Sequence, residues 1–224
     1  MMKKQLLGAI FAMASLHTFA QIPFEVMVGN KQTQYFGYVQ KDLDSVGRWN
    51  IFSQSIYAIH HKDSSLNSIS IDGQLTCMLN NYVGIAAGGA YDGKQFNPTL
   101  GLSFTYVNSK RNFVVTAFPT LQWAKPMALD LFALLNYTPQ FTKNWGLFLQ
   151  IILGTNLGVQ KEQANQKREV LNFFTRHNGS TQLLRLGLNF RQKFQFGMGA
   201  DLAQFGMNEG TFENFGLFVR CQIE

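Results

Sequence analysis

The sequence has little charge, and it has no long apolar run after its first twenty residues. Asp, Glu, Lys and Arg make up 14% of the 224 residues, whereas soluble domains carry about a quarter. Beyond the N-terminus no stretch approaches the roughly 18 apolar residues that a membrane-spanning helix needs. The 21 Phe are too many for a solvated coil. The composition excludes a disordered chain and argues against a helical membrane protein.

Cysteine and histidine are also scarce. Cys77 and Cys221 are the only two cysteines, and both fall on the apolar faces of predicted strands that lie far apart. We interpret them as small hydrophobic residues rather than a disulfide, although an exported chain permits one. With four histidines and no zinc or iron spacing, we expect no metal site and no cofactor. Without Lys3 and Lys4, which lie in the first twenty residues, the net charge is 17 − 13 = +4, and this excess is too small and too scattered to predict a nucleic-acid partner.

The first twenty residues have the form of a secretory signal peptide. Lys3 and Lys4 precede an apolar stretch at 6–16, and Thr-Phe-Ala then forms a small-x-small cleavage site. We predict that 1–20 is cleaved and that 21–224 forms a single exported domain. The alternative, a helix that remains in the protein, is disfavoured because the apolar stretch is too short to span a membrane.

From Phe24 onward, apolar and polar residues alternate with a period of two. In one segment Leu184, Leu186 and Leu188 alternate with Arg185 and Asn189, which is typical of a strand with one apolar and one polar face. Breaks rich in Gly, Asn, Asp and Pro divide the chain into strands. The predicted strands are 24–29, 33–40, 48–59, 67–79, 83–91, 98–107, 112–122, 127–138, 145–158, 181–191, 195–205 and 212–223.

These segments predict an all-β protein, a twelve-stranded antiparallel transmembrane β-barrel of the outer-membrane type. If the first two strands are one bent strand, the number falls to eleven, and the even count of bacterial barrels favours twelve. Trp49, Trp123 and Trp145 all lie at strand ends, as expected of aromatic residues at both membrane interfaces. A soluble lipocalin-like barrel has the same alternation, but the aromatic positions, strand number and signal peptide favour the outer membrane of a Gram-negative bacterium.

The predicted layout resembles small outer-membrane barrels of Bacteroidota, whose signal peptides often end as Ala20-Gln21 does. It is similar to the twelve-stranded nucleoside-specific channel family. The likeness is most specific in 33–49 (TQYFGYVQKDLDSVGRW), with a strand, a Lys-Asp turn and a Gly-x-Trp strand start. The last strand departs from the usual pattern because it ends Ile223-Glu224 rather than in Phe or Trp. The resemblance implies a passive channel with a nucleoside-like solute.

The longest predicted loop, 159–180, falls on the side that is extracellular if the N-terminus is periplasmic. Spacings such as Glu162 to Gln166 predict a short surface helix within it. The loop either packs on its own barrel or contacts an envelope protein. Within it, His177 and Ser180 could form a catalytic pair, but their spacing differs from that of outer-membrane phospholipases. We therefore interpret them as part of a polar turn and predict that the protein is not an enzyme.

The polar strand faces define the candidate functional site, the barrel lumen. Arg185 and Asp201 become direct cross-strand partners if a three-residue turn lies at 192–194. A polar interior of both charge signs suits either a hydrogen-bonded filled core or a narrow polar path. We expect a narrow passive channel for small polar solutes; the alternative is a non-transporting accessory subunit of a larger outer-membrane complex, docked through 159–180 or the lipid face. The predicted lumen-lining residues are Arg48, Asp72, Asp130, Arg185, Arg191, Asp201 and Arg220.

Overall fold

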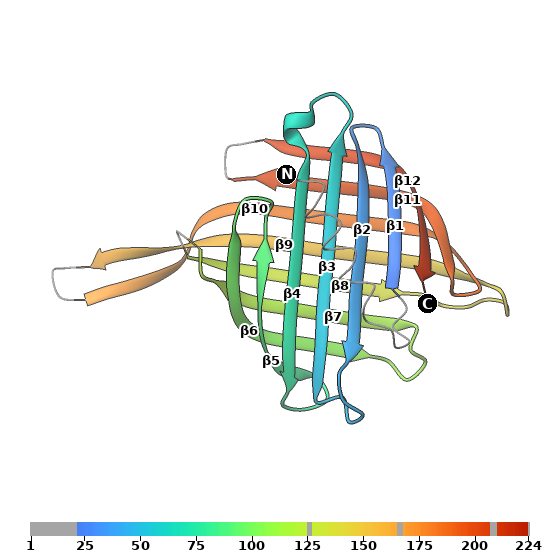
Figure 1. The fold of residues 1–224 in the computed structure, drawn as a ribbon, viewed down its shortest axis with the longest axis horizontal. Coiled ribbons are helices and arrows are strands. Elements are labelled where there is room, and N and C mark those ends of the chain that lie inside the picture. Colours follow the sequence, from blue (N-terminus) through green and yellow to red (C-terminus); the bar gives the residue numbers. More distant parts are fainter. Residues whose placement is uncertain (1–21, 125–126, 165–167, 207–209, 224) are drawn as a thin grey trace.

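The chain forms a closed barrel of twelve strands in which each strand pairs with its neighbours in sequence and β1 pairs with β12 (Figure 1). The computed structural model describes residues 22–124, 127–164, 168–206 and 210–223, and only the backbone of 159–164, 168–176 and Ile223. The predicted signal peptide, 1–20, lies outside the described residues. The strands are β1 (Ile22–Gly29), β2 (Gln32–Asp42), β3 (Trp49–His60), β4 (Ser68–Met78), β5 (Val83–Tyr91), β6 (Phe96–Val107), β7 (Phe113–Gln122), β8 (Ala128–Tyr137), β9 (Trp145–Ala164), β10 (Arg168–Phe190), β11 (Phe194–Phe205) and β12 (Thr211–Ile223).

All the ladders are antiparallel, including the seam between β1 and β12, where Glu25 lies opposite Arg220. Closure removes the free sheet edges that a flat sheet would expose. The predicted twelve-stranded antiparallel barrel is confirmed, and β1 and β2 are separate strands. Within the described part of the chain, no helix is long and apolar enough to cross a membrane.

The barrel has two distinct ends. We call the end where β1 begins and β12 ends the terminal end; the β2–β3, β4–β5, β6–β7, β8–β9 and β10–β11 turns lie there. The other end, the hairpin end, carries the remaining turns, including the three-residue 3-10 helix Ser64–Leu66. Trp49 and Trp145 open strands at the terminal end, whereas Trp123 follows β7 at the hairpin end.

The segment predicted as a long loop with a short helix is instead a β-hairpin. β9 and β10 stay paired as far as Ala164 and Arg168, and Figure 1 shows this hairpin projecting beyond the other strands. The helix prediction is wrong because i,i+4 pairs supply only about 0.2–0.5 kcal/mol each. A continued ladder instead satisfies the backbone N–H and C=O groups of both strands.

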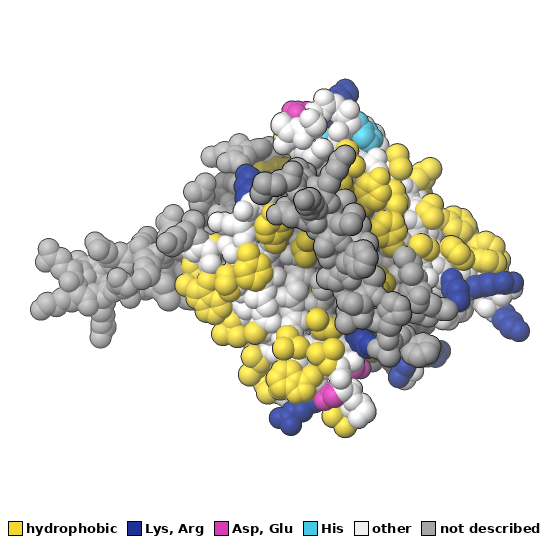
Figure 2. All heavy atoms as spheres, viewed as in Figure 1, with side chains coloured by type: hydrophobic (Ala, Val, Ile, Leu, Met, Phe, Trp, Pro, Cys, Tyr) yellow, Lys and Arg dark blue, Asp and Glu magenta, His cyan; other side chains and the backbone are white. Residues whose placement is uncertain are grey.

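The outer face of the barrel is apolar. Leu217 is 67% exposed and Leu186 is 50% exposed, although both are hydrophobic. Figure 2 shows hydrophobic side chains spread over the outer surface of the strands, with Lys and Arg at the ends of the barrel. A water-soluble barrel would direct its apolar face inward, so this arrangement fits the outer-membrane type of barrel.

The interior contains apolar side chains as well as polar ones. Phe52 on β3 packs against Phe118 on β7 and Phe132 on β8, with ring centroids 5.0 and 5.5 Å apart. A second cluster joins Met27, Phe148 and Phe218, and a third joins Phe36, Leu134, Ile152 and Leu183. These clusters connect strands that are not neighbours, so side chains fill much of the barrel.

Candidate functional site

A cavity of about 480 Å³ enters the barrel from the terminal end, and we call it the terminal pocket. Tyr38, Phe148 and Arg220 lie on its wall at strand positions inside the barrel, and side chains of three turns form its rim. A second cavity of about 620 Å³ opens at the same end beside the β2–β3 and β4–β5 turns. The lining of the terminal pocket comprises Tyr38, Lys110, Arg111, Asn112, Asn136, Thr138, Gln140, Phe148, Asn189, Gln192, Gln195, Arg220 and Gln222.

A chain of hydrogen bonds begins at this pocket. The Asn136 amide nitrogen donates to the Tyr38 hydroxyl (3.3 Å), and Asn136 Oδ1 accepts from Gln150 Nε2 (2.7 Å). The Gln150 oxygen accepts in turn from Arg220 Nη2. The Arg220 guanidinium also lies over the Phe148 ring, 4.7 Å from its centroid. Polar contacts therefore connect the pocket wall to the seam.

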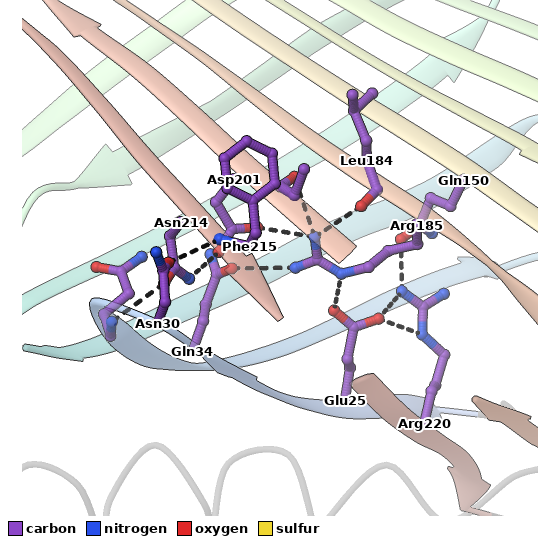
Figure 3. Close-up of polar contacts among 12 residues, drawn as sticks. Glu25, Asn30, Gln34, Gln150, Leu184, Arg185, Asp201, Asn214, Phe215 and Arg220 are labelled. Carbon is purple, nitrogen blue, oxygen red and sulfur yellow. Dashed lines mark hydrogen bonds and ion pairs between the residues drawn. The ribbon is translucent and has the colours of Figure 1, made fainter. Parts of the chain in front are cut away.

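Glu25 continues the chain by bridging two arginines (Figure 3). Its Oε2 accepts from Arg220 Nε at 3.0 Å, and its Oε1 accepts from Arg185 Nε at 2.6 Å. Arg185 also donates to Gln34 Oε1 at 3.1 Å and pairs with Asp201 Oδ1 at 2.7 Å. The three strands β1, β10 and β12 are thus joined through one carboxylate.

This series of hydrogen bonds ends near the hairpin end of the barrel. Asn214 Nδ2 donates to the second Asp201 oxygen at 3.1 Å, and Asn214 Oδ1 accepts from the backbone nitrogens of Lys31 and Gln32. We call the whole series, from Tyr38 to Asn214, the polar chain. It runs through the lumen from the terminal pocket to the turn between β1 and β2.

The charged part of the polar chain is balanced. Glu25, Arg185, Asp201 and Arg220 are each 1–3% exposed, and two carboxylates face two guanidinium groups. Burying an ion costs several kcal/mol unless partners and hydrogen bonds compensate for the lost water. The shared Glu25 carboxylate supplies that compensation for both arginines, so this network is a structural element of the lumen wall.

Arg185 and Asp201 form the predicted ion pair, but the predicted register is wrong. The Cα partner of Arg185 is Gly199, and Asp201 lies opposite Leu183. The turn comprises 191–193, because Phe190 pairs with Phe194, and its Arg191 and Gln192 have φ angles of 53° and 59°. The long Arg185 side chain reaches Asp201 diagonally.

Arg48 and Arg191, which the sequence predicts to line the lumen, lie outside the strands. Arg48 precedes β3 and is exposed, beside Gly47 with a φ of 66°. Arg191 is exposed in the β10–β11 turn, with its guanidinium 5.1 Å from the centroid of the Phe190 ring. The alternation that fixes a side chain's direction holds only within a strand, and both residues fall just outside one. Arg48 lines the second cavity at the terminal end.

Asp72 and Asp130 lie on the opposite wall of the lumen from the polar chain's charges. Asp72 on β4 accepts from Gln54 Nε2 at 3.0 Å, and Asp130 on β8 accepts from Asn156 Nδ2 at 3.5 Å. Their described partners are amides, and neither carboxylate forms an ion pair within the described residues. This wall therefore differs in charge from the seam.

Sequence reasoning missed Glu25, which holds the network together. It stands between Phe24 and Val26 in an alternating strand, so its inward direction could have been found from parity alone. Its pairing with Arg185 and Arg220 could not, because these residues are 160 and 195 positions away.

His177 and Ser180 lie on β10 rather than in the predicted polar turn. His177 Nε2 is 2.6 Å from Ser180 Oγ, and Ser180 Oγ is also 3.1 Å from Thr155 Oγ1. A nucleophile and a base are therefore in contact, but no described residue is hydrogen-bonded to the other ring nitrogen of His177. In the catalytic triad of serine hydrolases, such a third group orients the base.

Trp49, Trp123 and Trp145 are 43, 48 and 37% exposed, which places their rings on the outside of the barrel at both ends. Cys77 and Cys221 are free thiols. Among the described residues, no group of three or more His, Cys, Asp or Glu side chains could hold a metal ion.

Comparison with known proteins identifies the fold. No family model and no curated protein matches the sequence. Among solved structures, the chain is similar to the NanC porin, at 8% identity and a TM-score of 0.50, over 92% of this chain and 99% of that one. It is also similar to the KdgM porin (10%, 0.47, 91% and 99%) and to an outer-membrane channel from Pseudomonas putida F1 (12%, 0.45, 93% and 97%). The chain has the fold of a twelve-stranded outer-membrane barrel.

Proposed function

We propose that this protein is an outer-membrane barrel that lets small polar solutes pass through a narrow lumen. The polar chain is the observation that supports this function most strongly. It provides a continuous series of hydrogen-bonding groups along the lumen, from the terminal pocket to the hairpin end. A polar solute can exchange hydrogen bonds with such a wall as it moves. The apolar outer face and the tryptophans at both ends fit a location in lipid.

Because Phe52, Phe118 and Phe132 pack together across the interior, we expect the path to be narrowest there and solutes to be selected by size. The experiment is swelling of liposomes that contain the refolded protein, with glycerol, uridine and raffinose as solutes. Glycerol should enter fastest and raffinose should be excluded; entry of uridine would support the nucleoside-like solute that the family resemblance implies. A barrel that is folded by circular dichroism but admits no solute would overturn the proposal.

Replacing Phe52 tests the position of the narrowest point. Phe52→Ala removes the ring that contacts Phe118 and Phe132, so it should widen the path and raise single-channel conductance severalfold. The matched control is Phe104→Ala, on the outer face at 41% exposure, which should leave conductance unchanged. Equal conductance of the two variants would place the barrier elsewhere.

A second function, a non-transporting accessory subunit, is favoured by a different observation. Apolar clusters fill much of the interior, and the β9–β10 hairpin extends beyond the barrel. The hairpin and the lipid face are the surfaces through which an envelope protein would bind. Co-purification of a stoichiometric partner from native membranes, together with no solute entry, would support this function over the channel.

A further inference from the structure

Three adjacent turns at the terminal end carry positive charge and no carboxylate. The β6–β7 turn contributes Lys110 and Arg111, the β8–β9 turn Lys143, and the β10–β11 turn Arg191 and Lys193. The turns are neighbours around the rim, since they connect successive strand pairs from β6 to β11. Such a rim concentrates anions at the opening, because the field of several like charges adds.

Among the described residues, the lining of the terminal pocket behind this rim also contains no carboxylate. Its lining contains three cationic side chains, Lys110, Arg111 and Arg220. Lys110 and Arg111 form no ion pair within the described residues. Within the described residues, the hydrogen bonds of Arg220 use Nε and Nη2 and leave Nη1 for another acceptor. Most of the other lining residues are Asn and Gln.

Two buried amide oxygens in the same lining have no hydrogen-bond partner among the residues that the structure describes. Gln195 is 2% exposed, and its Oε1 makes no hydrogen bond, although its Nε2 donates to Asn189 at 3.2 Å. Gln222 Oε1 is also buried and unpaired. A buried acceptor without a donor costs about 1–3 kcal/mol. Hydroxyl groups of a bound molecule would supply the missing donors.

We propose that the terminal pocket binds small organic anions that carry several hydroxyl groups. The anionic group lies at the Lys110 and Arg111 rim, and the hydroxyls bind the Gln195 and Gln222 oxygens in the pocket wall. This inference rests on the proposed function, because it names the class of solute that would enter the path from the terminal end.

The test uses three six-carbon chains that differ mainly in charge: gluconate, sorbitol and glucamine, which is a cation at pH 7. Binding to the purified full-length barrel in zwitterionic detergent is measured by titration calorimetry at low salt. Gluconate should bind at least tenfold more tightly than sorbitol, and glucamine should bind most weakly. Raising the salt concentration should reduce the gluconate advantage.

Two variants locate the site. Lys110→Gln with Arg111→Gln should weaken gluconate binding about tenfold, as expected for two partly screened charges, and leave sorbitol binding unchanged. Gln195→Leu should weaken sorbitol and gluconate alike. The control is Lys94→Gln in the β5–β6 turn at the other end, which should change neither.

The outcomes separate this inference from the channel proposal. Equal binding of the three compounds, or gluconate binding unaffected by the rim variant, overturns the anion site even if the barrel conducts. Gluconate binding that the rim variant weakens, in a barrel that admits no solute, supports the anion site and overturns the passive channel.

Discussion

The two walls of the lumen provide different partners for their buried polar groups. The wall formed by β9–β12 and β1 contains charges of both signs, and Glu25 pairs with Arg185 and Arg220. The wall formed by β3–β8 combines the Phe52 cluster with Asp72 and Asp130, whose described partners are amides. Charges on the first wall compensate one another and fix the structure, whereas the two carboxylates on the second wall have hydrogen bonds from amides and no ion pair within the described residues.

The largest effect on stability should come from removing the carboxylate that Arg185 and Arg220 share. Glu25→Gln leaves Arg185 and Arg220 buried without their common partner, which should reduce the free energy of unfolding by about 3–5 kcal/mol. The measurement is urea unfolding of the barrel in lipid vesicles. Glu213→Gln, an exposed position on β12, should have an effect near zero. A similar loss for both variants would show that the network does not stabilise the seam.

The outer face of β10 provides the next test. Leu186→Arg places a charge on the apolar outer face, which should cost roughly 2–4 kcal/mol in a bilayer. Asn189 lies on the lumen side of the same strand, beside the terminal pocket. Asn189→Arg should therefore reduce the stability of the barrel much less. Folding yields into vesicles report both, and equal losses would contradict the assigned facing.

A smaller effect concerns the coupling of Arg185 to Asp201. Asp201→Asn alone leaves part of the Arg185 charge uncompensated, so it should destabilise the barrel more than the double variant with Arg185→Gln does. The double-mutant cycle should give a favourable coupling of about 1–3 kcal/mol. In a conducting barrel, Asp201→Asn should also shift ion preference toward anions. Additive stabilities would mean that the 2.7 Å contact contributes no net energy.

The smallest effect on stability is expected for Asp63, whose carboxylate is exposed to water. The Ser65 hydroxyl and the Ser65 backbone N–H, both bonded to Asp63 in the β3–β4 turn, hold the pKa of Asp63 below its usual value. Because the folded-state pKa is lowered, this contribution is present above the usual pKa and is lost as the pH falls through the lowered one. NMR titration of Ser65→Ala should show the Asp63 pKa rising toward its ordinary value. An unchanged pKa would exclude the Ser65 hydroxyl as the main cause.

The architecture could be predicted from the sequence because alternation is a local signal. Leu186 faces outward and Arg185 inward for the same reason, the two-residue period of a strand. The apolar clusters inside the barrel were harder to predict. In β7, Phe118 lies on the inward face between Thr116 and Thr120, so parity gives its direction, but no local pattern indicates that its ring packs against Phe52 and Phe132.

The details of the site depend on features that a local pattern does not contain. The β10–β11 register follows from positive φ angles at Arg191 and Gln192, which neither residue type favours. The links from Glu25 to β10 and β12 require the closed barrel itself. The segment 159–180 was misassigned because its polar composition resembles that of a loop, whereas its backbone continues the ladder of β9 and β10.

The seam network has a consequence for the order of assembly. Glu25 and Arg220 are separated by 195 positions, so their contact closes almost the longest loop that the chain can form. Contacts of such long range form late, because the chain entropy lost in closing the loop must be compensated by structure already present. Until β12 arrives, β1 carries a carboxylate without one of its arginines, which disfavours insertion of an incomplete sheet into lipid. The ion pairs that hold the finished barrel closed would thus also act during biogenesis as a requirement that all twelve strands be present.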